Sequence, residues 1–283
     1  MKALEGKIAL VTGGSRGAGR GIAIELGKAG ATVYVTGRST PGKTTHDRPE
    51  TIDETVSRIE ACGGKGIAVR CDHTQDSETQ ALIDQIRSEQ GRLDILVNNV
   101  WGGNELPIEY APFWEQPLKH WDHMFTSGVR AQLAMNFFAL PLMREHEQGV
   151  IFHTTFWDDH KYLGNFYYDL AKNALTRMAY GLSVELKPDK IAVLAISPGW
   201  MRTELVLRSL NTDEEHWQEV DELKRTESPY YIGRAIAALA GDPKVMEKSG
   251  QVLLVGDLAK EYRFTDIDGR YIPPFKATYT DMH

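Results

Sequence analysis

The stretch Ile8-Ala9-Leu10-Val11-Thr12-Gly13-Gly14-Ser15-Arg16-Gly17-Ala18-Gly19, near the start of a chain of 283 residues, decides the fold. It joins a short β-branched run to a turn with the spacing Gly-x-x-x-Gly-x-Gly, and a helical pattern of apolar residues follows at 21–26. This order predicts a strand, a tight turn and a helix. In a βαβ unit, such a turn points backbone N–H groups and the helix N-terminus at a pyrophosphate, and a Cβ on its glycines would block the close approach. The stretch therefore predicts a dinucleotide-binding unit.

Six further short apolar runs along the chain have the length and composition of buried strands: 32–35, 66–70, 95–97, 150–153, 191–196 and 252–255. Helical patterns lie between these runs, one of them at 52–61, and no linker interrupts the alternation. We therefore expect one domain over 1–283, an α/β Rossmann fold with a doubly wound, seven-stranded parallel sheet and helices on both faces.

The composition limits the partners and the compartment. Lys and Arg number 32 and Asp and Glu 39, so the net charge of −7 argues against a nucleic acid or an anionic membrane as main partner. The two cysteines, Cys62 and Cys71, lack metal-ligand spacing and are expected to be thiols in a reducing compartment. No window of about 18 apolar residues predicts a membrane span, and a strand begins too early for a signal peptide. We expect a cytoplasmic protein.

Tyr168 and Lys172 are four residues apart, so they share one face of a predicted helix and can reach the same small molecule. Such a pair is common by chance, and an ordinary surface or core pair is the simpler interpretation when it stands alone. Together with the glycine turn, it indicates a proton donor with a cation that tunes it.

These motifs resemble the classical short-chain dehydrogenases/reductases, and the resemblance covers nearly the whole chain. The segments that carry it are 12–19, 71–74, 96–99, 168–172 and 197–199 with Thr203. Within the family, the segments 98–101, 113–114, 121–130 and 249–270 resemble the dehydrogenase/reductase member-one branch.

The resemblance implies an oxidoreductase that transfers a hydride between a nicotinamide cofactor and a carbonyl or secondary alcohol. Tyr168 would be the acid/base, and Lys172 would lower its pKa and bind the nicotinamide ribose. Bringing a phenol from a pKa near 10 to about 7 takes roughly 4 kcal/mol, and a cation about 4 Å away can supply this. Thr155 falls where the family has a serine that hydrogen-bonds the substrate oxygen, with Thr154 the alternative if the register is one residue off.

The resemblance also implies a set of cofactor contacts. Asp72 would contact the adenine, Asn98 the adenosine ribose and Thr203 the nicotinamide amide. The complete expected set is Gly13, Ser15, Arg16, Gly17, Gly19, Arg38, Asp72, Asn98, Tyr168, Lys172, Pro198, Gly199 and Thr203. No metal is expected.

Two arginines decide which dinucleotide is expected. An acidic residue about 20 positions after the glycine turn would favour NAD, but Arg38 stands there, and Arg16 lies inside the turn. Guanidinium groups suit a 2′-phosphate, so NADP(H) is preferred over NAD(H).

Gly128 departs from the family's catalytic pattern, because the family has an asparagine there that holds a water on a proton relay to Lys172. Asn136 lies eight residues on and does not align. A glycine can open the helix so that a backbone carbonyl holds the water, in which case Gly128→Asn should be tolerated. This departure and Thr155 leave an alternative open, an NADP(H)-binding sensor or scaffold with little turnover. An enoyl reductase is disfavoured, because its tyrosine would fall on Asn165.

The remaining expectations concern the substrate and assembly. Residues 200–227 are a candidate substrate lid or a solvated insertion, and 257–283 form a C-terminal tail. Aromatic residues expected near the site would favour a bulky apolar substrate where they face it: Trp101, Phe113, Trp114, Phe156, Trp157, Tyr162, Phe166, Tyr167 and Trp200. His153, Asp158, Asp159 and His160 are interpreted as a solvated loop rather than a metal site. A homodimer or homotetramer that pairs helices near 121–144 and 165–187 is expected from the resemblance.

Overall fold

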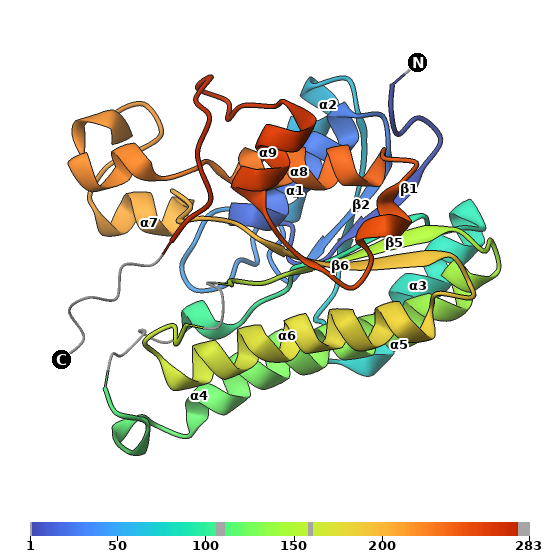
Figure 1. Ribbon diagram of the computed structural model, residues 1–283, viewed down its shortest axis with the longest axis horizontal. Coiled ribbons are helices and arrows are strands. Elements are labelled where there is room, and N and C mark those ends of the chain that lie inside the picture. Colours follow the sequence, from blue (N-terminus) through green and yellow to red (C-terminus); the bar gives the residue numbers. More distant parts are fainter. Residues whose placement is uncertain (1, 106–110, 158–160, 277–283) are drawn as a thin grey trace.

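Seven strands form one parallel sheet in the computed structural model, which describes residues 2–105, 111–157 and 161–276 (Figure 1). The strand order is β3-β2-β1-β4-β5-β6-β7. The strands are β1 (Ile8–Val11), β2 (Thr32–Gly37), β3 (Lys65–Arg70), β4 (Ile95–Asn98), β5 (Gly149–Thr154), β6 (Ile191–Ser197) and β7 (Val252–Leu254). The expected seven-stranded Rossmann sheet is therefore confirmed.

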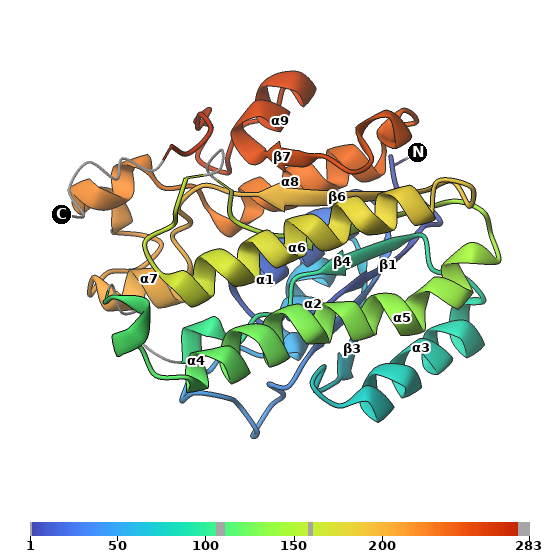
Figure 2. The same cartoon turned by 60° about the horizontal axis from the view of Figure 1, so that its bottom comes forward.

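Helices cover both faces of this sheet. On one face lie α1 (Gly17–Lys28), α2 (Ile52–Ala61), α8 (Pro229–Ala240) and α9 (Val255–Tyr262). Figure 2 turns the other face forward, with α3 (Asp76–Gln90), α5 (Ala131–Arg144) and α6 (Phe166–Glu185). Because both faces are covered, strand side chains are buried on both sides, which is why the strands have continuous apolar runs.

The sheet changes winding direction between β1 and β4, which are neighbours although two strands separate them in sequence. Parallel strands end at the same edge, so a crevice for ligands opens there. The glycine turn lies at this edge, with φ of 66° at Gly13 and 53° at Gly17, a conformation that favours glycine. Helix α1 then packs closely on α8, since a Cβ at Gly21 would meet the Pro229 carbonyl oxygen at 2.0 Å.

A long helical segment begins near the crevice and runs into the helical layer that contains α3, α5 and α6. It begins with the short α4 (Lys119–Trp121), continues as a π-helix over Asp122–Arg130 and becomes α5. π-Helical turns widen a helix and often occur at functional sites. This widened turn contains Gly128, which is buried.

The segment 200–227 stands at the carboxyl end of β6. It contains α7 (Glu204–Ser209) and short 3-10 turns at Trp217–Glu219 and Asp221–Arg225. Leu207, Trp217 and Leu223 form a small apolar cluster of their own there. Within the described residues, none of the helices is long and apolar enough to cross a membrane.

Candidate active site

A cavity of about 1140 Å³ opens at the carboxyl edge of the sheet. It extends from the end of β2 past the glycine turn to α6 and the segment after β6. Most of the residues expected from the sequence line it: Gly13, Ser15, Arg16, Gly17, Arg38, Asp72, Thr155, Tyr168, Lys172, Pro198, Gly199 and Thr203.

Gly19 and Asn98 do not line the cavity. A Cβ at Gly19 would meet the Gly13 carbonyl oxygen at 2.1 Å, so this glycine allows the turn to pack on α1. Asn98 is fully buried, and its Nδ2 donates to Asn136 Oδ1 at 2.8 Å. The next residue, Asn99, lines the cavity instead and donates through Nδ2 to the carbonyl oxygens of Thr12 and Gly13, both at 3.1 Å.

His153 is a buried residue of β5, so the interpretation as part of a solvated loop is wrong for it. Its Nδ1 lies 2.8 Å from Gln132 Oε1 and its Nε2 lies 3.2 Å from Asn136 Nδ2. Burial lowers the pKa of His153 to about 3, which keeps the ring neutral. His153 therefore ties β5 to α5. Asp158, Asp159 and His160 lie outside the described residues.

Lys172 and Tyr168 meet at the inner end of the cavity. The Lys172 ammonium is buried, with its Nζ 5.6 Å from the centre of the Tyr168 ring and 3.8 Å from the centre of the Trp101 ring. Burial lowers the pKa of Lys172 to about 7. The helix that carries the pair starts with a cap, because Asn165 Oδ1 accepts from the Tyr168 amide at 2.9 Å.

Thr155 lies beside this pair, but its hydroxyl hydrogen is engaged. Its Oγ1 donates to the main-chain carbonyl oxygen of Lys172 at 2.9 Å. Thr154 is engaged as well, since its Oγ1 lies 3.3 Å from Asn99 Oδ1. The Thr155 hydroxyl must rotate before it can donate to a substrate oxygen, although its lone pairs can accept.

The space beside Gly128 is filled by the Trp101 ring. A Cβ at Gly128 would lie 2.7 Å from Cε3 and 2.8 Å from Cζ3 of that indole. The expectation that Gly128→Asn is tolerated is therefore wrong, because any side chain here would collide with the indole ring in its present position.

A cationic end of the cavity lies where β2 finishes. Arg16 Nη2 donates to Ser39 Oγ at 2.9 Å and to Thr45 Oγ1 at 3.3 Å. Burial, together with the charge of Arg48, lowers the pKa of Arg16 to about 10. Ser39, Thr45 and Arg48 line the cavity with Arg16 and Arg38. The sequence did not single out these three, because they belong to a polar loop without periodicity.

Asp72 lies near the same end. Burial by itself would raise the pKa of the Asp72 carboxyl, but hydrogen bonds from the Thr74 hydroxyl and amide lower it. The carboxylate is therefore charged and fixed in position at the cavity wall.

Glu204, the first residue of α7, reaches back to the glycine turn. Its Oε2 accepts from the Gly17 amide at 2.8 Å, and its Oε1 lies 3.5 Å from Arg20 Nη1. The candidate lid thus touches the N-terminus of α1 through a carboxylate. No local sequence pattern could predict this contact, because it joins residues 187 positions apart.

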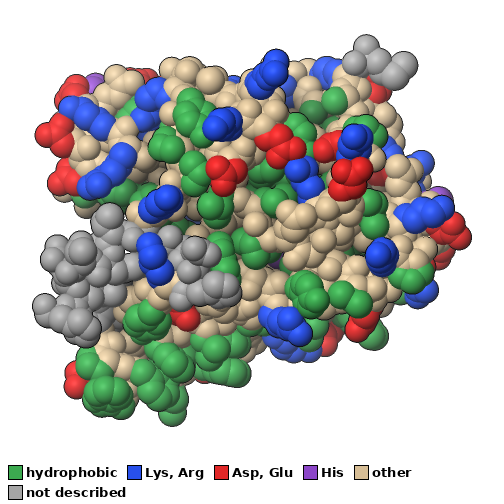
Figure 3. Space-filling model, in the orientation of Figure 1, with side chains coloured by type: hydrophobic (Ala, Val, Ile, Leu, Met, Phe, Trp, Pro, Cys, Tyr) green, Lys and Arg blue, Asp and Glu red, His purple; other side chains and the backbone are tan. Residues whose placement is uncertain are grey.

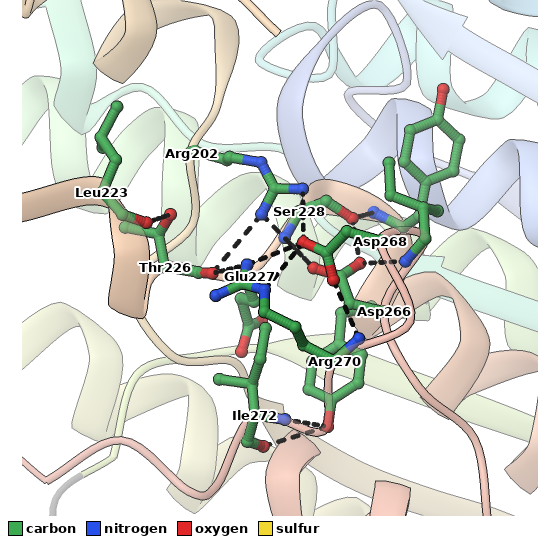
Figure 4. A network of polar contacts seen from close by, with 12 residues as sticks. Arg202, Leu223, Thr226, Glu227, Ser228, Asp266, Asp268, Arg270 and Ile272 are labelled. Carbon is green, nitrogen blue, oxygen red and sulfur yellow. Dashed lines mark hydrogen bonds and ion pairs between the residues drawn. The ribbon is translucent and has the colours of Figure 1, made fainter. Parts of the chain in front are cut away.

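A buried ionic network joins the segment 200–227 to the C-terminal segment (Figure 4). Arg202, 1% exposed, lies 3.4 Å from both Asp266 Oδ2 and Asp268 Oδ2, and its guanidinium covers the Trp217 ring at 4.1 Å. Asp266 also accepts from the Ser228 amide at 2.7 Å. The network holds the two segments that border the outer cavity.

Glu227 is buried beside this network, and its Oε2 accepts from the Gly199 amide at 3.0 Å. Burial raises the pKa of Glu227 to about 8. Its main chain pairs with Trp200 and Arg202, so the two ends of the segment 200–227 lie side by side.

The aromatic residues near the site divide into two groups. Trp101, Phe156 and Trp200 line the cavity, joined by Phe275 from the C-terminal segment. The other expected aromatics do not line it: Phe113, Trp114, Trp157, Tyr162, Phe166 and Tyr167.

Comparison with known proteins identifies the family. The profile described as short chain dehydrogenase matches residues 7–215. The chain belongs to this family. The human and mouse proteins named Dehydrogenase/reductase SDR family member 1 are 34% and 33% identical to it over 282 and 280 residues, covering 96% of this chain and 87% of each relative. The family predicted from the motifs is confirmed, and these two relatives bear out the resemblance to the member-one branch.

Other short chain dehydrogenases share both sequence and fold with this chain. The 7alpha-hydroxysteroid dehydrogenase of Escherichia coli K12 is 29% identical over 255 residues, covering 89% of this chain and 93% of the relative. A solved 7alpha-hydroxysteroid dehydrogenase complexed with NADH and 7-oxo glycochenodeoxycholic acid has a TM-score of 0.73 at 28% identity, covering 89% and 93%. A short chain dehydrogenase from Mycobacterium thermoresistibile reaches 0.81 at 26% identity, covering 98% and 96%. The protein is thus an oxidoreductase of a family that uses nicotinamide cofactors.

Proposed function

We propose that the protein is an NADP(H)-dependent carbonyl reductase or alcohol dehydrogenase that acts on a bulky, apolar substrate. The observation that carries the proposal is that one cavity joins the half-buried Tyr168 and the buried Lys172 to the cationic end formed by Arg16, Arg38 and Arg48. The first is suited to proton transfer and the second to a phosphate.

The residues present fit a dinucleotide. The N-terminus of α1 points into the cavity behind a turn of glycines, which suits a pyrophosphate, and Asp72, which lines the same cavity, would contact the adenine. Ser39 and Thr45 supply hydroxyl groups beside Arg16, where a 2′-phosphate would bind. This donor set of cations and hydroxyls supports NADP(H) rather than NAD(H).

Three side chains of the protein have separate roles in the proposed reaction. NADP(H) supplies or accepts the hydride when it is bound. Tyr168 gives its phenolic proton to the oxygen of the reduced carbonyl, or removes it in the opposite direction. Lys172 stabilises the phenolate by its charge, and its lowered pKa, about 7, allows it to exchange a proton near neutral pH. Thr155 accepts or donates a hydrogen bond at the substrate oxygen after its hydroxyl rotates.

The outer cavity supports an apolar substrate. Phe156, Trp200, Met201 and Phe275 line it beyond the Tyr168 side chain. We propose that 200–227 acts as the substrate lid, since Trp200 and Met201 stand at its base and residues 270–276 continue the cavity wall. Ring-shaped ketones are the substrates to test first, because a related enzyme is solved with a 7-oxo bile acid.

The assembly is a further part of the proposal. Large apolar side chains are exposed on the faces of α4, α5 and α6: Trp121, Leu133, Phe137, Leu170, Tyr180 and Val184. We propose that they pair across a two-fold axis in a homodimer or homotetramer. A cytoplasmic location is proposed because Cys62 and Cys71 are both free thiols.

A second candidate is favoured by one observation, the bond from the Thr155 hydroxyl to the Lys172 carbonyl. A site whose hydroxyl stays turned away from the substrate would bind the cofactor and turn over slowly, as a sensor or scaffold does.

One experiment separates the two functions. The protein is assayed with a panel of steroid, bile-acid and aromatic ketones, each with NADPH and with NADH, and cofactor affinity is measured in parallel by fluorescence. Turnover that Tyr168→Phe abolishes supports the reductase. Tight NADPH binding without turnover on any ketone supports the sensor.

A further inference from the structure

The indole of Trp101 lies in a slot formed by two glycines. A Cβ at Gly128 would come within 2.7 Å of the ring, and a Cβ at Gly103 within 2.4 Å of Cζ2 on the same indole. These distances are too short for any side chain, so both positions must be glycine for the ring to stay in this place. Gly128 belongs to the widened π-helix and Gly103 to the 3-10 turn Gly103–Glu105. Two separate elements are therefore shaped around one ring.

The face of that indole is turned to the Lys172 ammonium. The Nζ atom lies 3.8 Å from the ring centre, well within the distance over which a cation is attracted to an aromatic face, and tryptophan gives the strongest attraction. The ammonium is buried, and burial opposes its charge. The indole is thus a partner that stabilises this charge without bringing a carboxylate into the site.

The same indole also packs against the Tyr168 ring. The two ring centres are 5.7 Å apart at an interplanar angle of 89°, an edge-to-face arrangement. Trp101 therefore contacts both members of the catalytic pair and lines the cavity with them.

We propose that Trp101 is a positioning residue, which holds the Lys172 ammonium and the Tyr168 ring in register from the place where a side chain at position 128 would otherwise lie. The inference rests on the proposed function, because it assigns Trp101 a role in that reaction. It also explains Gly128: the glycine is a requirement of the indole and not the loss of a catalytic group.

Variants at position 101 separate this role from simple packing. Trp101→Phe keeps an aromatic face, whereas Trp101→Leu keeps apolar bulk and loses the face. If Trp101 positions Lys172, Trp101→Leu should lower kcat at least tenfold with KM for the ketone and Kd for NADPH within about twofold, and Trp101→Phe should recover most of the rate. Equal rates in the two variants would overturn the proposal.

Titration of Lys172 gives a readout that needs no turnover. Lysine labelled with ¹³C at Cε is followed by NMR, with Lys172→Met to assign the signal. Around the ammonium, Tyr168 is the titratable group facing it from α6, while Thr155, Trp101 and Gly128 bring no charge from the neighbouring segments. Trp101→Leu should shift the pKa of Lys172 down by about one unit, because the charged form loses its aromatic partner in a dry site, and Trp101→Phe should shift it less. An unchanged pKa of Lys172 in Trp101→Leu would overturn the proposal even if the protein proved to be a sensor. A shifted pKa in a protein without turnover would contradict the proposed function alone.

A double variant at positions 101 and 128 completes the test. Gly128→Asn alone should collide with the indole and lower both the thermal midpoint and kcat. In Trp101→Ala with Gly128→Asn the collision is removed, and an amide can take the freed space near Lys172. We expect this double variant to unfold at a higher temperature than Gly128→Asn and to exceed the kcat of Trp101→Ala at least fivefold. If the effects of Trp101→Ala and Gly128→Asn on the thermal midpoint and on kcat are additive, a side chain at position 128 does not compete with the indole for the same space, and the proposal is overturned.

Discussion

The carboxylate of Glu204 accepts a hydrogen bond from the Gly17 amide at 2.8 Å, across 187 residues of sequence. Gly17 is the first residue of α1, where backbone N–H groups and the helix dipole favour an anion. The candidate lid therefore places its own anion at the helix end where the pyrophosphate of the proposed cofactor would bind.

Glu204→Gln should strengthen NADPH binding about three- to tenfold, because the amide keeps a hydrogen-bond acceptor and removes a negative charge next to the phosphates. Affinity is measured by fluorescence titration at two ionic strengths. Glu215→Gln, an exposed change in the same segment, is the matched control and should leave the affinity unchanged. Weaker binding of NADPH by Glu204→Gln would show that the carboxylate supports the bound state instead.

Tyr168→Phe should lower kcat by about 10²- to 10⁴-fold, since the change removes only the oxygen that carries the proton. Cofactor affinity should stay within a few-fold of the parent. Tyr167→Phe is the control, because the Tyr167 ring is buried among Phe113 and His120 and does not line the cavity. A Tyr168→Phe protein with near-normal turnover would remove Tyr168 from the mechanism.

Arg38→Ala should weaken NADPH binding by roughly tenfold or more and leave NADH binding nearly unchanged, because the 2′-phosphate is the group that a guanidinium would bind here. Arg58→Ala is a suitable control, as Arg58 pairs with Glu54 on α2 and does not line the cavity. Both cofactors are titrated against all three proteins. An equal loss for NADH and NADPH would mean that Arg38 acts on the fold.

The assembly is tested at Phe137, which is 71% exposed on α5. Phe137→Glu should convert the proposed oligomer to smaller species in light scattering at micromolar concentration, because a charge cannot be buried unpaired in an apolar interface. Ile267→Glu, on an exposed residue of the C-terminal segment, should not change the mass. A parent protein that is already monomeric would refute the oligomer.

Trp114 and Leu118 extend the apolar surface beyond the helices, at 80% and 77% exposed. Figure 3 shows hydrophobic side chains gathered at the lower left of the molecule, where the segment before α4 lies. The same scattering experiment on Leu118→Glu shows whether this surface belongs to the interface.

Much of the fold follows from short-range patterns in the sequence. The apolar runs place all seven strands within about two residues, because strands buried on both faces must be continuous apolar segments. The glycine turn and the Tyr168–Lys172 spacing likewise depend on neighbours in sequence. These local signals identify the family and the cavity that contains most of the expected residues.

Contacts between distant segments could not be predicted in this way. Whether Asn98 or Asn99 faces the cavity depends on one residue of strand register, and the structure turns Asn98 toward Asn136. The place of Trp101 on Gly128 requires the loop after β4 to fold over the π-helix. From its polar side chain, His153 is expected at the surface. Inside the core, however, Gln132 and Asn136 supply hydrogen-bond partners for its two ring nitrogens.

Glu227 makes the stability depend on pH in a testable way. Burial raises the pKa of this carboxyl in the folded protein from 4.5 to about 8, so between these values the folded state holds a proton that the unfolded state releases. The free energy of unfolding contributed by Glu227 is therefore highest below about pH 4.5 and is lost as the pH rises toward 8. The full loss amounts to roughly a few kcal/mol.

Glu227→Gln keeps the shape and the acceptor for the Gly199 amide but cannot ionise. Urea unfolding at pH 5 and at pH 8 should show that the variant gains stability relative to the parent as the pH rises, by about 1 kcal/mol or more. The buried histidines contribute equally to the pH dependence of the parent and of the variant. The difference in stability between the two proteins therefore reports on Glu227 alone. Glu222→Gln, an exposed residue in the same segment, should follow the parent at both values. Parallel stability of Glu227→Gln and the parent across this range would mean that Glu227 stays ionised in the fold, held by Arg202 and the network of Figure 4.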